Sequence, residues 1–90
     1  MNLVAVGVNH TTADVELRER LAFSTQQAEA ALASLREMPG VREAALLSTC
    51  NRTELYCLTD DVSPNFTQWL ASSRNLSAER LSTVLYQHSG

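Results

Sequence analysis

Apolar residues recur along the chain with two different periodicities, and each predicts a different element. The valine-rich apolar run from Leu3 to Val8 predicts a buried strand. After Ser24 the apolar residues recur every three or four positions, as on one face of a helix. These residues are Ala28, Ala31, Leu32, Leu35 and Met38. Ser24 and Gln27 have the spacing of a capping box, and Pro39-Gly40 predicts the end of this helix.

A β-hairpin is predicted in the middle of the chain. Residues 43–49 predict one strand, Cys50-Asn51 is the expected turn, and residues 52–58 predict the second strand. The side chains of that second strand alternate between two faces. Thr53, Leu55 and Cys57 point to one face, and Glu54, Tyr56 and Leu58 point to the other. Tight hairpins favour Asn-Gly or Asp-Gly, so Asn51 is the residue expected to adopt a positive φ.

Further segments complete the predicted fold. Residues 15–21 predict a short helix capped by Thr12 or Asp14. A later helix is expected to begin at Ser63-Pro64, with proline at its first helical position. The inner face of that helix is expected to comprise Phe66, Trp69, Leu70 and Ser73. Residues 77–81 predict one more helical turn, and residues 83–87 predict the last strand.

The order of the main elements predicts the fold class. Strand, helix, strand, strand, helix, strand is the pattern of a ferredoxin-like βαββαβ sandwich, an α+β fold with an antiparallel sheet and helices on one face. Ninety residues make one domain, 1–90, with a modest core. The chain has no apolar run of membrane-spanning length and no signal-peptide pattern. We therefore expect a cytoplasmic protein without membrane contact.

Composition excludes several kinds of chemistry. The net charge is −3, which argues against an independent nucleic-acid-binding domain. All seven basic residues are arginine, and the absence of lysine excludes Schiff-base chemistry and a P-loop. With three glycines and no glycine-rich motif, the chain also lacks a dinucleotide-binding loop.

The two cysteines are predicted to be free thiols with different surroundings. At ~3.3 Å per residue the strand geometry separates Cys50 and Cys57 by roughly 20 Å, whereas a disulfide needs Cα atoms within about 7 Å. Cys57 shares an apolar face with Leu55 and is expected to be a small buried hydrophobic residue. The chain offers a poor zinc site, and without a Cys-x-x-Cys motif it does not fit a thiol-redox protein.

Cys50 is the candidate nucleophile. It lies among polar residues at a strand end, next to Arg52. A thiol becomes a strong nucleophile when a cation or turn amides stabilise its thiolate, and Arg52 could supply that cation. Arg52 could instead bind a substrate carboxylate in bidentate fashion. A solvent-exposed thiol without function in a hairpin turn is the alternative interpretation.

Three blocks of the sequence resemble the glutamyl-tRNA reductase family. They are GVNHTTA at residues 7–13, LRERLAF at residues 17–23 and LSTCNRTELY at residues 47–56. The third block is the most specific. The resemblance continues more weakly to Gly90 through Trp69-Leu70 and residues 85–88.

This resemblance implies an N-terminal catalytic, glutamyl-binding domain. In the family a thiol attacks the ester of glutamyl-tRNA, and NADPH then reduces the thioester to glutamate-1-semialdehyde in the first step of tetrapyrrole (5-aminolevulinate) biosynthesis. Cys50 matches the nucleophile. Thr49, Asn51 and Arg52 match the segment that holds the glutamyl group at the aminoacylated 3′ end of tRNA. Turn amides are candidate donors to the oxyanion. The resemblance also implies a homodimer that passes its product to the next pathway enzyme.

The sequence also departs from the family pattern. Thr11 and Asp14 occupy positions that are lysine and proline in many members, which lowers the positive charge near the site. The family's catalytic histidine lies shortly beyond Gly90, and its NADPH-binding and dimerisation domains are not in this chain. We therefore expect a segment of a longer protein that cannot complete the reduction and binds no cofactor itself.

Several charged residues have two interpretations each. His10 could approach the hairpin or make a structural hydrogen bond, and Glu54 could orient Arg52 or form a weak surface ion pair. Arg18 and Arg20 could meet RNA phosphates or lie on a solvated helix face. His88 is expected to be structural or exposed. At the level of the domain, the alternative function is a regulatory docking module of the same enzyme, responding to haem or a partner protein.

Overall fold

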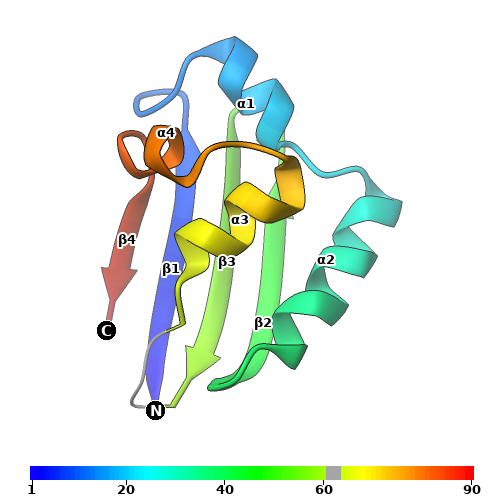
Figure 1. Cartoon of the computed structure of the whole chain (residues 1–90), viewed down its shortest axis with the longest axis vertical. Helices are drawn as coiled ribbons and strands as arrows, with labels where there is room; N and C mark the ends of the chain where they lie inside the picture. Colours follow the sequence, from blue (N-terminus) through cyan, green and yellow to red (C-terminus); the bar gives the residue numbers. More distant parts are fainter. Residues whose placement is uncertain (61–63) are drawn as a thin grey trace.

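A computed structural model describes residues 1–60 and 64–90. Within these residues, four strands form one antiparallel sheet in the order β2-β3-β1-β4. Helices cover one face of this sheet (Figure 1). The elements are β1 (Asn2–Asn9), α1 (Val15–Leu21), α2 (Thr25–Glu37), β2 (Val41–Ser48), β3 (Arg52–Thr59), α3 (Phe66–Arg74), α4 (Ala78–Ser82) and β4 (Tyr86–Ser89). The predicted α+β class with an antiparallel sheet is confirmed.

The register of the sheet places the predicted turn beside the loop that follows β1. The central strands pair along their full length, from Asn2 opposite Thr59 to Asn9 opposite Arg52. Strand β2 pairs with β3 and contains a bulge near its start, whereas β4 pairs with β1 over only four residues. The β2–β3 turn therefore lies at the end of the sheet where β1 ends at Asn9 and β3 begins at Arg52.

Alternation along the strands separates a core face from an outer face. The core face packs against the helices in two clusters. Buried members of these clusters include Val8, Leu17, Leu21, Leu70 and Leu81 in one, and Val4, Val6, Leu35, Leu55, Cys57 and Phe66 in the other. Trp69 and Leu85 contact both clusters, so the core is continuous. The prediction that Cys57 is a buried hydrophobic residue is confirmed.

Side-chain caps define the helix starts. The Asp14 carboxylate accepts a hydrogen bond from the Leu17 amide at 2.9 Å, so Asp14 rather than Thr12 caps α1. Ser24 and Gln27 form the predicted capping box of α2. After α2 the chain reverses through Gly40, whose φ of 90° favours glycine.

The last strand was predicted too early in the sequence. Residues 83–85 belong to a turn that continues α4, because the Val84 and Leu85 amides donate to the Leu81 carbonyl. Both side chains are half-buried against the core, which explains their apolar character. The strand itself occupies Tyr86–Ser89.

The start of α3 also differs from the prediction. Asn65 caps the helix by accepting from the Gln68 amide at 3.0 Å, and Phe66 is the first helical residue. Ser63 lies outside the described residues. Phe66 and Leu70 are buried and Trp69 is half-buried as predicted, but Ser73 is exposed. Ala71 occupies the inner face instead.

Candidate functional site

Cys50 lies in a tight turn that a hydroxyl group stabilises. We call residues 49–51 the thiol turn. The Thr49 amide donates to the Arg52 carbonyl at 2.8 Å. The Thr49 hydroxyl accepts from the Asn51 and Arg52 amides, both at 3.2 Å. These hydrogen bonds stabilise the turn without the positive φ that a glycine would allow. The predicted positive φ at Asn51 is wrong, because Asn75 is the one non-glycine residue with a positive φ among the described residues.

The same hydrogen bonds bear on the expected oxyanion donors. Two amides of the turn region, those of Asn51 and Arg52, are already engaged by the Thr49 hydroxyl. An oxyanion could use them only if it displaced that hydroxyl. The side chain of Thr49 therefore stabilises the turn.

The two thiols differ in exposure as predicted. Both are free; Cys50 is exposed, whereas Cys57 is fully buried. Burial raises the pKa of the Cys57 thiol to about 11, since an apolar environment disfavours the thiolate. Of the two, Cys50 is thus the thiol that a substrate can reach.

Helix α1 forms one wall of a cavity beside Cys50. The cavity has a volume of about 420 Å³. Its lining consists of Val15, Arg18, Glu19, Ala22, Phe23, Ser48, Thr49 and Cys50. The Arg18 guanidinium donates to the Cys50 carbonyl at 3.4 Å and to the Ala13 carbonyl at 2.9 Å. Arg18 thus contacts the thiol turn, a position the helix pattern did not indicate, although Arg18 belongs to the second family-like block.

Hydroxyl groups attach the hairpin to the end of α1. The Ser48 hydroxyl accepts from the Phe23 amide at 2.9 Å and lies 3.3 Å from the Thr53 hydroxyl. The Thr53 hydroxyl in turn donates to the Leu21 carbonyl at 3.5 Å. These contacts hold the two walls of the cavity together, so the thiol turn is fixed relative to Arg18.

Arg52 lies on the sheet face away from the helices. This outer face carries Leu3, Glu54, Tyr56, Leu58 and Tyr86. The Arg52 guanidinium donates to Glu54 at 3.4 Å, and Glu54 is buried rather than part of a surface ion pair. The pKa of Glu54 is lowered, chiefly by the hydrogen bond from the Tyr86 hydroxyl. Burial acts in the opposite direction, but the hydrogen bond from Tyr56 and the charge and hydrogen bond of Arg52 lower the pKa further. Glu54 and Arg52 therefore lie on the same face of β3.

The loop after β1 places His10 near the same end of the sheet. His10 is exposed. The loop is held by Asn9, whose side-chain oxygen accepts from the Thr11 and Thr12 amides at 2.9 and 3.2 Å. The structural hydrogen-bonding role considered for His10 therefore belongs to Asn9. His88 is exposed, as expected.

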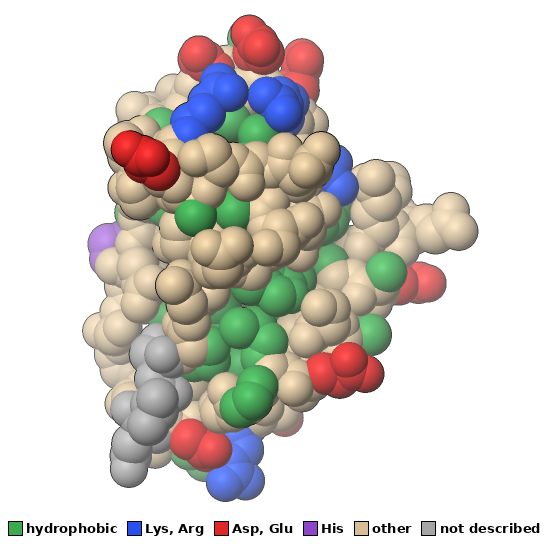
Figure 2. Space-filling model, viewed as in Figure 1, with side chains coloured by type: hydrophobic (Ala, Val, Ile, Leu, Met, Phe, Trp, Pro, Cys, Tyr) green, Lys and Arg blue, Asp and Glu red, His purple; other side chains and the backbone are tan. Residues whose placement is uncertain are grey.

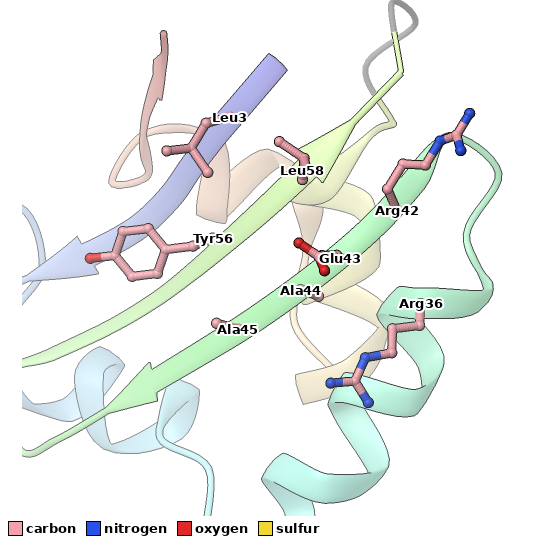
Figure 3. Close-up of a pocket in the computed structure, with 8 residues that line it drawn as sticks. All are labelled: Leu3, Arg36, Arg42, Glu43, Ala44, Ala45, Tyr56 and Leu58. Atoms are coloured by element: carbon pink, nitrogen blue, oxygen red, sulfur yellow. The ribbon is translucent and has the colours of Figure 1, made fainter. Parts of the chain in front are cut away.

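A larger cavity opens elsewhere on the outer face and over the edge strand β2 (Figure 3). It has a volume of about 570 Å³. Its lining consists of Leu3, Arg36, Arg42, Glu43, Ala44, Ala45, Tyr56 and Leu58. No residue of the thiol turn lines it, and its lining contains no nucleophilic thiol. We therefore place the candidate site at the smaller cavity, which contains Cys50.

Charges of both signs are interspersed near α1. Figure 2 shows arginine and acidic side chains close together at the end of the molecule that carries α1 and α4.

Among residues 1–60 and 64–90, no helix is long and apolar enough to cross a bilayer. In the same residues, no group of three or more His, Cys, Asp or Glu side chains could hold a metal ion.

Fold and site together define a class: a small antiparallel α+β domain that presents one exposed thiol on a turn, with Arg18 in contact with that turn and Arg52 directly after it. The family model described as "Glutamyl-tRNAGlu reductase, N-terminal domain" matches residues 6–90. The chain belongs to this family, and the resemblance seen in its three sequence blocks is confirmed.

Relatives of this chain are named glutamyl-tRNA reductase. The protein from Alcanivorax borkumensis is 94% identical over 90 residues, which are 100% of this chain and 22% of that protein. The protein from Marinobacter nauticus is 49% identical over 89 residues, covering 98% of this chain and 21% of the relative. The chain thus spans about a fifth of the length of these relatives.

A solved structure has the same fold. The glutamyl-tRNA reductase from Methanopyrus kandleri matches with a TM-score of 0.53 and 24% identity, covering 98% of this chain and 19% of that one. At this identity the match concerns the arrangement of strands and helices. It supports the α+β fold described above.

Proposed function

We propose that this chain is the glutamyl-binding catalytic domain of a glutamyl-tRNA reductase and that Cys50 forms a thioester with the glutamyl group. The observation that carries the proposal is the exposed thiol on a tight turn, at a cavity that also contains Arg18. Exposure gives an aminoacyl ester access to the sulfur. Membership of the family supplies the substrate class, the glutamate-charged 3′ end of a tRNA.

The reaction assigned to this domain is a transesterification. The Cys50 thiolate attacks the ester carbonyl carbon, and a C–S bond forms as the bond to the tRNA oxygen breaks. The ribose oxygen of the tRNA leaves as a hydroxyl by taking up from solvent the proton that the Cys50 thiol had released. Cys is an intrinsically strong nucleophile, and an ester is a good acyl donor, so this step needs orientation more than bond activation.

Arginine charge supports this chemistry from two directions. Arg18 contacts the Cys50 carbonyl from the α1 side and so brings a cation to the cavity that contains the thiol. Arg52 follows the turn and retains exposed N–H groups, with 46% of its side chain accessible. A planar guanidinium can pair with the γ-carboxylate of the glutamyl group in bidentate fashion. We assign Arg52 this recognition role, with Asn51 beside it.

Reduction of the thioester belongs to another part of the enzyme. NADPH supplies a hydride to the family reaction, but residues 1–60 and 64–90 offer no glycine-rich loop to bind it. No step of the proposed mechanism in this domain uses the cofactor. The finer fold assignment that we propose is ferredoxin-like. Its support is the strand order β2-β3-β1-β4, with helical connections from β1 to β2 and from β3 to β4 on one face of the sheet.

The test uses a chimera in which this chain replaces the matching segment of the A. borkumensis reductase. The chimera is mixed with glutamyl-tRNA in the absence of NADPH and analysed by peptide mass spectrometry. We expect a glutamyl adduct on Cys50, none in Cys50→Ser, and an unchanged adduct in the control Cys57→Ala. A Cys50→Ser chimera that reduces glutamyl-tRNA at the normal rate would refute the proposal and favour a regulatory docking role.

A further inference from the structure

A carboxylate on the outer face is surrounded by hydrogen-bond donors. One oxygen of Glu54 accepts from the Tyr86 hydroxyl at 2.5 Å. The other accepts from the Tyr56 hydroxyl at 2.9 Å and from Arg52 at 3.4 Å. Only 9% of the Glu54 side chain is accessible. A buried carboxylate that accepts several hydrogen bonds in this way has one defined orientation.

Tyr86 reaches this carboxylate across an intervening strand. Glu54 on β3 is paired with Gly7 on β1, and Gly7 is paired with Tyr86 on β4. The three residues form one row across the sheet. Neighbouring strands are about 4.8 Å apart, so the Tyr86 ring spans the position of Gly7. A side chain at Gly7 would occupy that space, because a Cβ there would lie 2.7 Å from Glu54 Cγ.

The protonation states suit donation from tyrosine to an ionised carboxylate. The hydrogen bond from Tyr86 is the main cause of the lowered pKa of Glu54. Burial, followed by the hydrogen bond to Glu54, raises the pKa of Tyr86 to about 12. Tyr86 therefore keeps its proton at neutral pH, and Glu54 keeps the negative charge that attracts Arg52.

Arg52 is held by this network and remains available to a ligand. It uses one N–H group on Glu54, whereas a guanidinium has five. Arg52 follows the thiol turn directly, so the orientation of its free N–H groups decides where a carboxylate can bind relative to Cys50.

We propose that Tyr86, through Glu54 and across Gly7, is a positioning residue for the glutamyl-recognising Arg52. This inference rests on the proposed function. Tyr86 fixes one carboxylate oxygen, which leaves the other in place to orient the guanidinium. The last strand of the domain thereby contributes to the selection of glutamate, although Tyr86 does not line the cavity that contains Cys50.

The experiment measures preference between two acyl groups with the chimera. The substrates are one tRNA charged with glutamate and the same tRNA charged with glutamine, which lacks the γ-carboxylate charge. For Tyr86→Phe we expect kcat/KM for the glutamyl substrate to fall about tenfold, chiefly through KM, with little change for the glutaminyl substrate. Arg52→Gln should lower the preference further. Adding Tyr86→Phe to Arg52→Gln should have no additional effect, because both act on one interaction.

Two further variants separate positioning from general stability. Ser34→Ala removes a hydrogen bond from Trp69 on the helical side, at 3.0 Å, and should leave the preference unchanged. Glu54→Gln should reproduce the loss of preference even if Tyr86→Phe folds poorly. Thermal unfolding of each variant identifies any loss of folded protein.

The outcomes distinguish the inference from the proposed function. If Arg52→Gln lowers the preference but Tyr86→Phe and Glu54→Gln do not, the positioning role is wrong and the proposed function stands. A Tyr86→Phe variant that slows both substrates equally would also overturn the positioning role. If Arg52→Gln leaves the preference intact, recognition by Arg52 is wrong and the inference fails with it.

Discussion

Gly7 on β1 lies directly opposite Glu54 on β3, and the two residues meet more closely than any other residue type at position 7 would allow. A Cβ atom on Gly7 would lie 2.5 Å from the Thr53 carbonyl oxygen and 2.7 Å from Glu54 Cγ. The first of these neighbours is backbone and cannot move without shifting β3. Glycine at this position is therefore a requirement of close packing across the sheet, with no need for an unusual φ.

The variant Gly7→Ala should be destabilised. We expect a loss of about 1–3 kcal/mol in the free energy of unfolding, because the added methyl group forces β1 and β3 apart. Urea unfolding measures this change. Gly90→Ala is the matched control, since no atom lies within 4 Å of a Cβ at that position. Equal stability of the two variants would contradict the packing argument.

The two thiols should react at very different rates with an alkylating reagent. In the native protein we expect iodoacetamide to label Cys50 at least ~100-fold faster than Cys57, because a buried thiol reacts only after the structure opens. Mass spectrometry of timed samples gives both rates. In urea the difference should nearly disappear. Comparable native rates would show that the core around Cys57 is not closed.

The free energy of unfolding should depend on pH through the ionisation of Glu54. Its folded pKa is lowered from the ordinary value of 4.5, so the ionised carboxylate stabilises the fold above that value. This contribution is lost as the pH falls through the folded pKa. Glu54→Gln should therefore be less stable than the parent at pH 7, and the gap should shrink below pH 4.5. Urea unfolding at several pH values checks this, with exposed Glu43→Gln as control.

The thiol turn should depend on the hydroxyl of Thr49. Thr49→Val keeps the shape of the side chain but removes the acceptor for two amides, and we expect a loss of about 0.5–2 kcal/mol. Thr67→Val on α3 is the control. Asn51→Gly should destabilise slightly or have no effect, since Asn51 has no positive φ to relieve. A gain of stability in Asn51→Gly would indicate strain in the turn.

Local pattern was sufficient to predict most elements of the fold. The cap of α1, the capping box at Ser24 and the alternation around Cys57 depend on residues a few positions apart. The structure confirms the last two, and of the two predicted caps of α1 it has Asp14. The pattern failed at residues 83–85. There an apolar run packs against the core from a turn, and its hydrophobicity resembles that of a strand.

Part of the site could not be predicted because its contacts join distant residues. Arg18 lies 32 residues before Cys50, and Tyr86 lies 32 residues after Glu54. Helical periodicity places Arg18 only on a polar face, and strand alternation does not identify which side chain spans Gly7. The Tyr86 contact follows from strand order and register, and the Arg18 contact follows from the packing of α1 beside the hairpin. Single-chain periodicity leaves both undetermined.

The hydroxyl-stabilised turn has a consequence for position 50. Thr49 supplies the hydrogen bonds, the described backbone there adopts no left-handed conformation, and the side chain of residue 50 points to solvent. Folding thus places almost no demand on which amino acid occupies this position, and serine or alanine would fit without distortion. The sulfur atom can therefore be removed while the scaffold stays as it is, and what such a variant loses in the chimera tests the role that we propose for Cys50.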